Sequence, residues 1–386
     1  MAKYKLGEIC EIVSGSTPKT GIAEYWDGNL KWITPAEIDD ESYIITDSAR
    51  KLTELGVKKT GLSSFPSGTV ILSSRAPIGK VAIAGCEMYC NQGFKNLICS
   101  DRINNRYLYW FLKGNTAYLN SLGRGATFKE ISKKIVSDIE INVPEISQQL
   151  AAVDALERVS EIIRLRKNQL QKLDELIKAR FVEMFGMPGT DTKGWGLQYL
   201  GTCCELNPKK GTDKRLVSGL SVSFVPMPAV SESGKIDASQ IKAYDEVKAG
   251  FTYFAENDVL FAKITPCMEN GKGAVAVGLC NNIGFGSTEF HILRPINNKS
   301  NPYWLYSLTS FDAFRKDAAD NMTGSAGQRR VPAVFLEKYR VTLPPIELQN
   351  QFAAFVEQTD KSKVAVQKSL DEAQLLFDSL MQQYFD

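Results

Sequence analysis

Residues 131–185 read ISKKIVSDIEINVPEISQQLAAVDALERVSEIIRLRKNQLQKLDELIKARFVEMF, and this stretch predicts most of the architecture. It begins with a closing strand, and from Ile146 its apolar residues follow the period of a helix. Apolar residues recur at steps of seven, which is typical of one long helix with a coiled-coil face: Leu156, Ile163, Leu170 and Ile177. The glycines and proline of GMPGT, which follows Phe185, end that helix.

The same pattern occurs twice, about 200 residues apart. The stretch ISKKIVSDIEINVP, residues 131–144, aligns without a gap on VPAVFLEKYRVTLP, residues 331–344, and both run into a helix start that contains glutamine. Two further pairs precede them: LGEICEIVSGSTPK at 6–19 with LGTCCELNPKK at 200–210, and YLYWFL at 107–112 with YWLYSL at 303–308. Two similar domains, each followed by a similar helix, therefore make up the chain.

This repeat predicts an α+β fold of four segments. Two β-rich domains occupy residues 1–145 and 189–345, where short apolar runs such as GTVILSS, KVAIAG, NDVLFAKI and STEFHILRP indicate strands between Gly, Pro, Ser and Asn turns. A central long helix occupies residues 146–188, and a second long helix occupies residues 346–386. The second helix has its own apolar seam, which includes Val356, Leu370 and Phe377.

The two helices are too long to serve a single domain core. At 1.5 Å per residue, roughly 40 residues span about 60 Å. We therefore expect them to pack antiparallel as a coiled-coil spacer, which relates the domains by an approximate two-fold axis. The alternative is that each helix packs on its own domain or mediates dimerisation.

Composition limits the possible classes of protein. The chain has 386 residues, 44% of them hydrophobic, and a net charge of only +2, so a DNA-binding role would need local basic loops or partner subunits. The start MAKYKLGE lacks an apolar export core, and no run approaches the roughly 18 apolar residues of a membrane span, which predicts a cytoplasmic protein with no membrane partner. The eight cysteines show no paired Cys-x-x-Cys zinc elements and are interpreted as reduced thiols.

Five strings occur along the chain in a set order: the LGEICEI opening, NQGFKNL at 91–97, GSTEFHILRP at 286–295, TGSAGQRRV at 323–331 and PPIELQNQ at 344–351. In their order and with the duplication of the chain, they resemble the specificity subunit of a type I restriction-modification enzyme. The resemblance covers essentially the whole chain. It implies that each β-rich domain is a target-recognition domain for one half of a bipartite sequence in double-stranded DNA, and that the helices form the spacer between them.

The resemblance also implies partners. Two modification subunits, which are methyltransferases, would dock on the helical spacer and flip an adenine of each half-site for methylation with S-adenosylmethionine. Restriction subunits would add ATP-driven translocation and cleavage. This chain would bind no cofactor itself, because S-adenosylmethionine, ATP and Mg²⁺ belong to those partner subunits.

Polar and basic loops in both domains are candidates for DNA contact, because Arg, Lys, Asn, Gln, Ser and Thr donate hydrogen bonds to base edges and phosphates. Lys129 and Arg329 occupy equivalent places in the repeat. The candidates of the first domain are Ser16, Thr17, Lys19, Ser74, Arg75, Lys80, Arg124, Thr127 and Lys129. Those of the second domain are Lys209, Lys210, Lys263, Thr265, Asn270, Lys272, Thr323, Ser325, Gln328, Arg329 and Arg330. Any single one of them could equally be an ordinary solvated turn residue.

The sequence offers few residues that could form a catalytic site. His291 is the one histidine and lies in a strand-like run, which favours a packed strand residue over a metal ligand or catalytic base. PIGKV and ENGKG lack the remaining residues of a phosphate-binding loop, and no Asn-Pro-Pro-Tyr or Asp-Pro-Pro-Tyr tetrapeptide of an adenine methyltransferase occurs. The favoured interpretation is a non-catalytic DNA reader. A non-enzymatic coiled-coil scaffold and a self-contained nuclease remain as alternatives.

Overall fold

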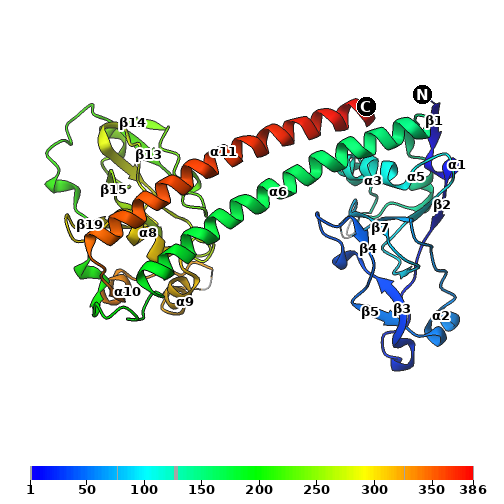
Figure 1. Cartoon of the computed structure of the whole chain (residues 1–386), viewed down its shortest axis with the longest axis horizontal. Coiled ribbons are helices and arrows are strands. Elements are labelled where there is room, and N and C mark those ends of the chain that lie inside the picture. Colours follow the sequence, from blue (N-terminus) through cyan, green and yellow to red (C-terminus); the bar gives the residue numbers. More distant parts are fainter. Residues whose placement is uncertain (1, 76, 126–128, 326, 386) are drawn as a thin grey trace. The chain divides into compact units, whose positions relative to one another are not determined.

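The chain forms two compact units in the computed structural model, which describes residues 2–75, 77–125, 129–325 and 327–385 (Figure 1). The first unit comprises Met1–Lys167 and Lys368–Asp386, and the second comprises Asn168–Gln367. Each unit therefore contains one β-rich domain and about half of each long helix. This division cuts across the four segments expected from the sequence, because the ends of the helices pack into the domain cores.

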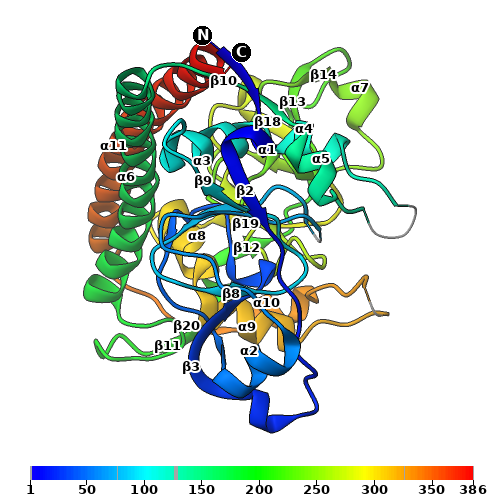
Figure 2. The ribbon, with the colours of Figure 1, turned by 90° about the vertical axis from the view of Figure 1, so that its right-hand side faces the viewer.

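The first domain is built on two sheets (Figure 2). Its five-stranded sheet has the order β2 (Cys10–Val13), β9 (Asn96–Cys99), β6 (Val70–Leu72), β7 (Val81–Ala84) and β4 (Ile44–Ile45). Its three-stranded sheet has the order β5 (Arg50–Leu52), β3 (Trp26–Ile33) and β8 (Tyr89–Cys90). A two-stranded ribbon pairs β1 (Ala2–Lys5) with β10 (Glu140–Val143).

Short helices flank the sheets of the first domain. Their bounds are α1 (Leu6–Ile9), α2 (Glu54–Thr60), α3 (Asn105–Gly114), α4 (Thr116–Ser121) and α5 (Lys133–Ser137), with 3₁₀ turns η1 (Ala23–Tyr25) and η2 (Pro35–Glu37). Helix α3 lies against β6 and β7 of the larger sheet, and α2 lies against β3 of the smaller one. Helix α3 begins where the Asn104 side chain accepts hydrogen bonds from the backbone N–H groups of Arg106 and Tyr107. Six consecutive residues of α3, from Tyr107 to Leu112, are buried. This helix is therefore the centre of the main core.

The second domain repeats this plan. One four-stranded sheet has the order β12 (Cys204–Leu206), β19 (Phe290–Pro295), β16 (Val259–Ala262) and β17 (Gly273–Val275). The other has the order β14 (Ile241–Ala243), β13 (Ser221–Val225), β18 (Ile283–Gly286) and β15 (Thr252–Ala255). The ribbon pairs β11 (Leu197–Tyr199) with β20 (Arg340–Thr342). The helices are α7 (Tyr244–Val247), α8 (Pro302–Ser310), α9 (Asp312–Asp320) and α10 (Ala333–Lys338), with 3₁₀ turns η3 (Leu200–Thr202), η4 (Lys210–Thr212), η5 (Met227–Ala229) and η6 (Cys280–Asn282).

The strand orders show which elements correspond. The order β2-β9-β6-β7 of the first domain matches β12-β19-β16-β17 of the second, and the parallel pair β3 and β8 matches β13 and β18. The repeated Leu-Gly at the start of each copy has a structural reason. Leu6 N–H donates to Ile139 O at 2.9 Å, and Leu200 N–H donates to Tyr339 O at 2.8 Å. A Cβ on Gly7 would lie only 1.8 Å from Ser137 Oγ, so the close approach requires glycine there.

Each long helix has 40 residues, α6 from Ile146 to Phe185 and α11 from Ile346 to Phe385. In the second unit they pair antiparallel, because Asp174 contacts Lys363 at 2.7 Å while Phe181, further along α6, stacks on Phe352, earlier in α11. In the first unit the start of α6 and the end of α11 belong to one core, which includes Leu156 and Phe377.

The sequence-based expectations for the fold are confirmed in their main points. The four apolar runs form β6, β7, β16 and β19, and both long helices begin within one residue of the expected positions. His291 is a packed residue of β19, only 5% exposed. The apolar seam is covered: Leu156 and Val356 are buried, and the remaining seam residues are half-buried, namely Ile163, Leu170, Ile177, Leu370 and Phe377.

Candidate nucleic-acid interface

Each domain presents one hairpin loop at an equivalent position, residues 124–130 in the first and 323–330 in the second. The backbones of Arg124 and Glu130 exchange hydrogen bonds of 3.0 and 2.9 Å at the base of the first hairpin loop. Thr323 and Arg330 exchange bonds of 3.0 and 2.8 Å at the base of the second. These backbone hydrogen bonds fix the position of the two ends of each loop on its domain.

A second loop supports each hairpin loop from behind. Ile131 N–H donates to Ser74 O at 3.0 Å in the first domain, and Val331 N–H donates to Lys263 O at 2.9 Å in the second. The two supporting loops, residues 73–80 and 263–272, follow the equivalent strands β6 and β16. Both hairpin loops are therefore tied to the sheet by the same backbone contact.

The lysines that end the supporting loops have a structural partner. Lys80 Nζ donates to Pro35 O at 3.0 Å, and Lys272 Nζ donates to Met227 O at 3.4 Å. Pro35 begins η2 and Met227 begins η5, so the two bonds are equivalent. Both ammonium groups are half-buried, and in the unbound protein they hold the loop to its neighbour.

A side chain just before β9 in the first domain and one on β19 in the second each contact the end of the hairpin loop, but the two copies use different chemistry. Lys95 Nζ, 9% exposed at the side chain, lies 3.2 Å from Glu130 Oε1 and 3.3 Å from Ser74 Oγ. His291, at the equivalent place, has its Nε2 2.8 Å from Val331 O. Burial lowers the pKa of His291, so the neutral ring donates this bond at neutral pH.

An ion pair adds a further anchor in the second domain. The guanidinium of Arg330 donates to both carboxylate oxygens of Glu289, at 2.9 and 2.8 Å. The pair lowers the pKa of Glu289 and raises that of Arg330. Burial lowers the pKa of the adjacent Lys263, which remains half-buried beside this pair.

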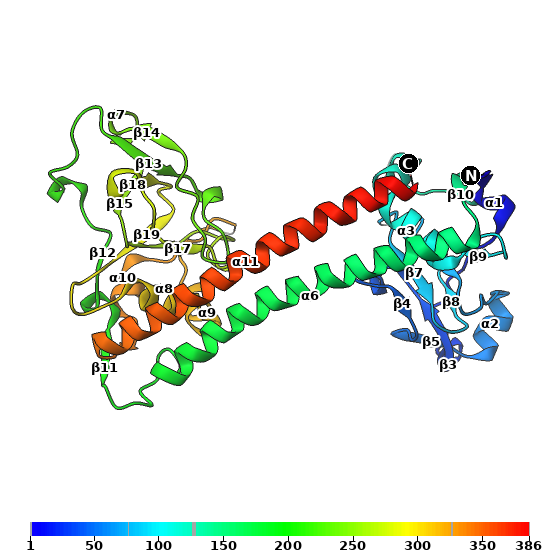
Figure 3. The same ribbon diagram turned by 45° about the horizontal axis from the view of Figure 1, so that its top comes forward.

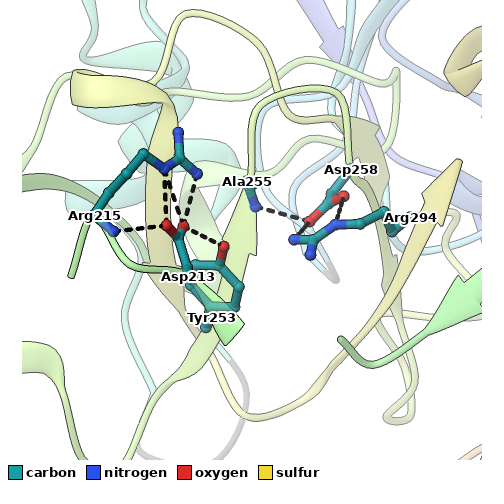
Figure 4. Close-up of polar contacts among 6 residues, drawn as sticks. All are labelled: Asp213, Arg215, Tyr253, Ala255, Asp258 and Arg294. Carbon is teal, nitrogen blue, oxygen red and sulfur yellow. Dashed lines mark hydrogen bonds and ion pairs between the residues drawn. The ribbon is translucent and has the colours of Figure 1, made fainter. Parts of the chain in front are cut away.

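The loop after β12 carries Lys209 and Lys210 and is held by the network drawn in Figure 4. Asp213 accepts hydrogen bonds from Arg215 Nε at 2.9 Å and from the Tyr253 hydroxyl at 2.7 Å, and the Arg215 contact lowers the pKa of the Asp213 carboxyl.

A second pair in the same figure lies deeper. Arg294 Nε and Nη2 donate to the two carboxylate oxygens of Asp258 at 2.8 and 2.7 Å, and Ala255 N–H donates to Asp258 Oδ2 at 2.7 Å. The guanidinium of Arg294 also lies 5.5 Å from the Tyr253 ring, so the two Asp–Arg pairs share one aromatic neighbour. These contacts hold the segment that follows Lys209 and Lys210.

The candidate residues differ widely in exposure. The exposed ones are Lys19, Arg124, Lys129, Lys209, Lys210, Asn270, Thr323, Ser325, Gln328 and Arg329. The half-buried ones are Ser16, Thr17, Arg75, Lys80, Lys263, Thr265, Lys272 and Arg330. Ser74 is fully buried, and Thr127 lies outside the described residues. The structure thus gathers Arg124 and Lys129 on one hairpin loop, and Thr323 to Arg330 on the other.

Comparison with known proteins gives the family. The family model for the type I restriction modification DNA specificity domain matches residues 1–175 and 220–373, so both copies of the repeat are matched. The chain belongs to this family. Its two β-rich domains are the family's specificity domains, and the mixed fold with two repeated domains and two long helices agrees with solved structures of the same kind.

Two curated relatives and two structures illustrate the similarity. The chain is 27% identical over 403 residues to the type I restriction enzyme MjaIX specificity subunit of Methanocaldococcus jannaschii, covering 98% of this chain and 90% of that protein. It is 34% identical over 251 residues to the EcoAI specificity subunit of Escherichia coli, covering 62% of this chain and 41% of that protein.

The S subunit of the type I restriction-modification system of M. genitalium shares the fold with a TM-score of 0.56 at 14% identity, over 100% of this chain and 96% of that one. A chain from a structural study of complex assembly and conformational transition in the type I system gives 0.56 at 17% identity, over 99% and 97%.

Sequence reasoning missed Lys95 and Arg215 as supports of the specificity-domain loops. Lys95 could have been found, because the repeat aligns it with His291, and two different polar residues at one strand position indicate a shared anchoring task. Arg215 gave no signal beyond its charge. Among the described residues, no helix could span a membrane and no cluster of three His, Cys, Asp or Glu side chains could hold a metal ion.

Proposed function

We propose that this chain is the sequence-reading subunit of a type I restriction-modification complex, with each specificity domain reading one half of a bipartite DNA target. The observation that carries this proposal is the pair of equivalent hairpin loops, each with an exposed basic residue at the same place, Lys129 in the first domain and Arg329 in the second. Each loop is closed by backbone hydrogen bonds between its first and last residues, and the two exposed basic residues lie next to these bonds.

The exposed members of the candidate set divide into two roles. Lysine and arginine side chains bind phosphates and fix the register, while amide and guanidinium groups can read base edges in the major groove. Gln328 and Arg329 are the base-reading candidates of the second hairpin loop, and Arg124 is that of the first. Lys80 and Lys272 are instead supports of the loops, because each already donates to a backbone carbonyl.

The two half-sites should differ in sequence. The hairpin loops read RGATFKE in the first domain and TGSAGQRR in the second, so the groups offered to the bases are not the same. A symmetric target would require similar side chains at equivalent places. The target therefore consists of two different short sequences, separated by a spacer whose bases are not recognised.

The long helices provide the docking surface for partner subunits. Several of their apolar side chains remain exposed, which is unusual for a surface without a partner: Ile162, Leu165, Leu375 and Leu376 in the first unit, and Leu176 and Val364 in the second. Two modification subunits bind there and carry S-adenosylmethionine, and restriction subunits supply the ATP- and Mg²⁺-dependent steps. This chain contributes recognition and no catalytic group.

A coiled-coil scaffold without DNA affinity is the competing function, and salt-dependent binding distinguishes the two. The assembled complex with its modification subunits is titrated with duplex DNA at several salt concentrations. Lys129→Ala should weaken binding and reduce the slope of log K against log salt by about 0.9 if the lysine contacts one phosphate, while Arg329→Ala should weaken binding and reduce the preference for the cognate half-site. Lys3→Ala, which removes an exposed charge of the β1–β10 ribbon, is the matched control. Binding that is absent, or unchanged in both variants, would favour the scaffold.

A further inference from the structure

The second unit contains a groove of about 940 Å³ beside the edge strand β17. Its walls come from α6, α8 and α11 and from the turn at residues 232–236. Apolar side chains form its floor, among them Ile177, Val275 and Tyr306. This volume is at the upper end of the range of about 300 to 1,000 Å³ that ligand pockets occupy.

The other copy of the repeat shows what fills the equivalent place. In the first domain, β4 pairs in parallel with β7 and forms the fifth strand of the sheet (Figure 3). Ile83 N–H donates to Tyr43 O at 2.7 Å, and Gly85 N–H donates to Ile45 O at 2.7 Å. The segment Tyr43–Ile45 thus adds a strand to an edge that would otherwise be open.

Tyr43 also packs between the sheet and the helices. Its ring centroid lies 4.7 Å from that of Tyr109 and 6.1 Å from that of Trp110, and its hydroxyl donates to Glu157 on α6. Trp110 in turn stacks on Phe377 of α11, with centroids 5.6 Å apart. The added strand β4 and the aromatic side chains therefore fill the space between the sheet of the first domain and the parts of α6 and α11 that belong to the first unit.

The second domain lacks both parts of this closure. Strand β17 pairs only with β16 among the described residues. Ala276 N–H and O bond to Asp258 and Asn257, so the alternation of a strand places the N–H groups of Val275 and Val277 on the opposite, open edge. These two residues are the counterparts of Ile83 and Gly85.

The space is also wider than in the first domain. Helices α3 and α8 both begin after a capping asparagine, Asn104 and Asn301. Counting from these caps shifts the sequence pairing of 107–112 with 303–308 by one residue, and it aligns Tyr109 with Tyr306 and Trp110 with Ser307. A small serine therefore stands where the first domain has an indole that contacts Tyr43. The groove is the volume that a strand and an aromatic side chain fill in the other copy.

The counterpart of β4 within this chain does not occupy the groove. It folds back as a tight turn, in which Ser231 N–H donates to Lys235 O at 2.9 Å. Its flanks are fixed by Asp237 N–H donating to Ala229 O at 2.8 Å and by Ser223 Oγ donating to Ala238 O at 2.9 Å. The turn places Gly234 against the ring of Tyr306 and forms one wall.

We propose that this groove accepts an extended peptide segment of a partner protein, which adds a strand parallel to β17 and inserts an aromatic side chain beside Tyr306 and Ser307. The inference goes beyond the reading of DNA, because it concerns protein docking. Peptides bound in this way gain affinity from main-chain hydrogen bonds and specificity from a side-chain pocket. The partner is a protein that docks on α6 and α11, because both helices line the groove.

The charges around the groove are partly paired. Lys363 lies 2.7 Å from Asp174 and 3.1 Å from Asp360, so its single positive charge offsets one of the two carboxylates. Asp312 has Lys178 at 3.9 Å. The apolar side chains of the lining, with the open strand edge, match a Tyr-Ile-Ile sequence like that of residues 43–45.

The test uses the full chain and a labelled peptide with the sequence of residues 39–48, DDESYIITDS, followed by fluorescence anisotropy. Ser307→Trp should abolish binding by restoring the indole of the other copy. Val277→Pro should abolish it by removing the N–H donor, while Val277→Ala keeps that donor and should bind within about threefold of the parent. An unchanged circular-dichroism spectrum and an unchanged unfolding midpoint of the full chain show that each variant is folded.

Hydrogen exchange gives an independent readout. In the free protein the amides of Val275 and Val277 should exchange at least about tenfold faster than those of Ile83 and Gly85, and the peptide should slow them. The proposal is overturned if no binding occurs up to about 1 mM peptide, the range of a very weak contact. It is also overturned if Val277→Pro and Ser307→Trp bind like the parent, or if the free edge is already protected.

Discussion

Replacing Gln349 by leucine is expected to destabilise the second unit by about 3 kcal/mol, because this side chain joins the start of α11 to the start of α8. Gln349 is fully buried. Its Oε1 accepts from Asn301 N–H at 2.9 Å, and its Nε2 donates to Lys299 O at 3.1 Å and Pro344 O at 2.7 Å. All three partners are backbone groups.

Gln149 makes the same contacts in the first unit. Its Oε1 accepts from Asn104 N–H at 2.8 Å, and its Nε2 donates to Arg102 O at 3.0 Å and Pro144 O at 2.8 Å. Because the N-cap residue of α3 or α8 is one partner in each case, the glutamine fixes the angle at which the long helix leaves its domain. We call these two residues the glutamine clamps.

The magnitude follows from the number of bonds. A typical hydrogen bond contributes about 1 kcal/mol net, and three bonds give about 3 kcal/mol. Leucine is close in size, so the loss of packing is small, but it leaves three backbone groups without partners. A free energy of about 3 kcal/mol corresponds to roughly a hundredfold faster exchange of amides that open with the unit.

Hydrogen exchange by mass spectrometry can assign this effect to one unit. In Gln349→Leu the amides of α8 should exchange faster while those of α3 remain as in the parent, and Gln149→Leu should show the reverse. Gln351→Leu and Gln148→Leu change exposed glutamines on the same helices and should alter stability by less than about 0.5 kcal/mol. A loss below about 0.5 kcal/mol in the clamp variants, or equal acceleration in both units, would refute this reasoning.

Two further predictions concern the second domain. The pKa of His291 in the folded chain is below its ordinary value, so the unfolded chain binds the proton at a higher pH, and the free energy of unfolding should fall as the pH decreases below about 6.5. His291→Gln should lose this pH dependence in denaturant titrations between about pH 7 and 5. A pH dependence that is the same in the variant and the parent would contradict the prediction. Arg294→Met leaves the buried Asp258 carboxylate with only the Ala255 N–H and should cost about 3 kcal/mol, most of which Asp258→Asn in the same chain should restore; an additive loss in the double variant would argue against the pair.

The sequence predicted the architecture where the signal was local or repeated. The bounds of α6 followed from the seven-residue apolar spacing and from the glycines and proline after Phe185. The strands β16 and β19 followed from short apolar runs between turns. In both cases neighbouring residues along the chain carry the information.

The roles of individual loop residues could not be predicted, because they depend on contacts between distant segments. Lys80 and Lys272 look like DNA-contacting lysines in the sequence, but each donates to a carbonyl 45 residues earlier in the chain. Ser74 lies in a polar loop and is nevertheless fully buried beneath Lys95. The open edge of β17 was equally hidden, because the exchange of Trp110 for Ser307 has no meaning until the two helices are superimposed.

The most direct test of the central claim, that each domain reads one half of the target, is to map methylated adenines after exchanging one domain. Residues 1–145 are replaced by the corresponding domain of another specificity subunit, and the complex is expressed in cells with its modification subunits. One half of the methylated motif should change while the other half and its bases remain the same. A motif that changes in both halves, or that proves to be one uninterrupted word, would contradict the account.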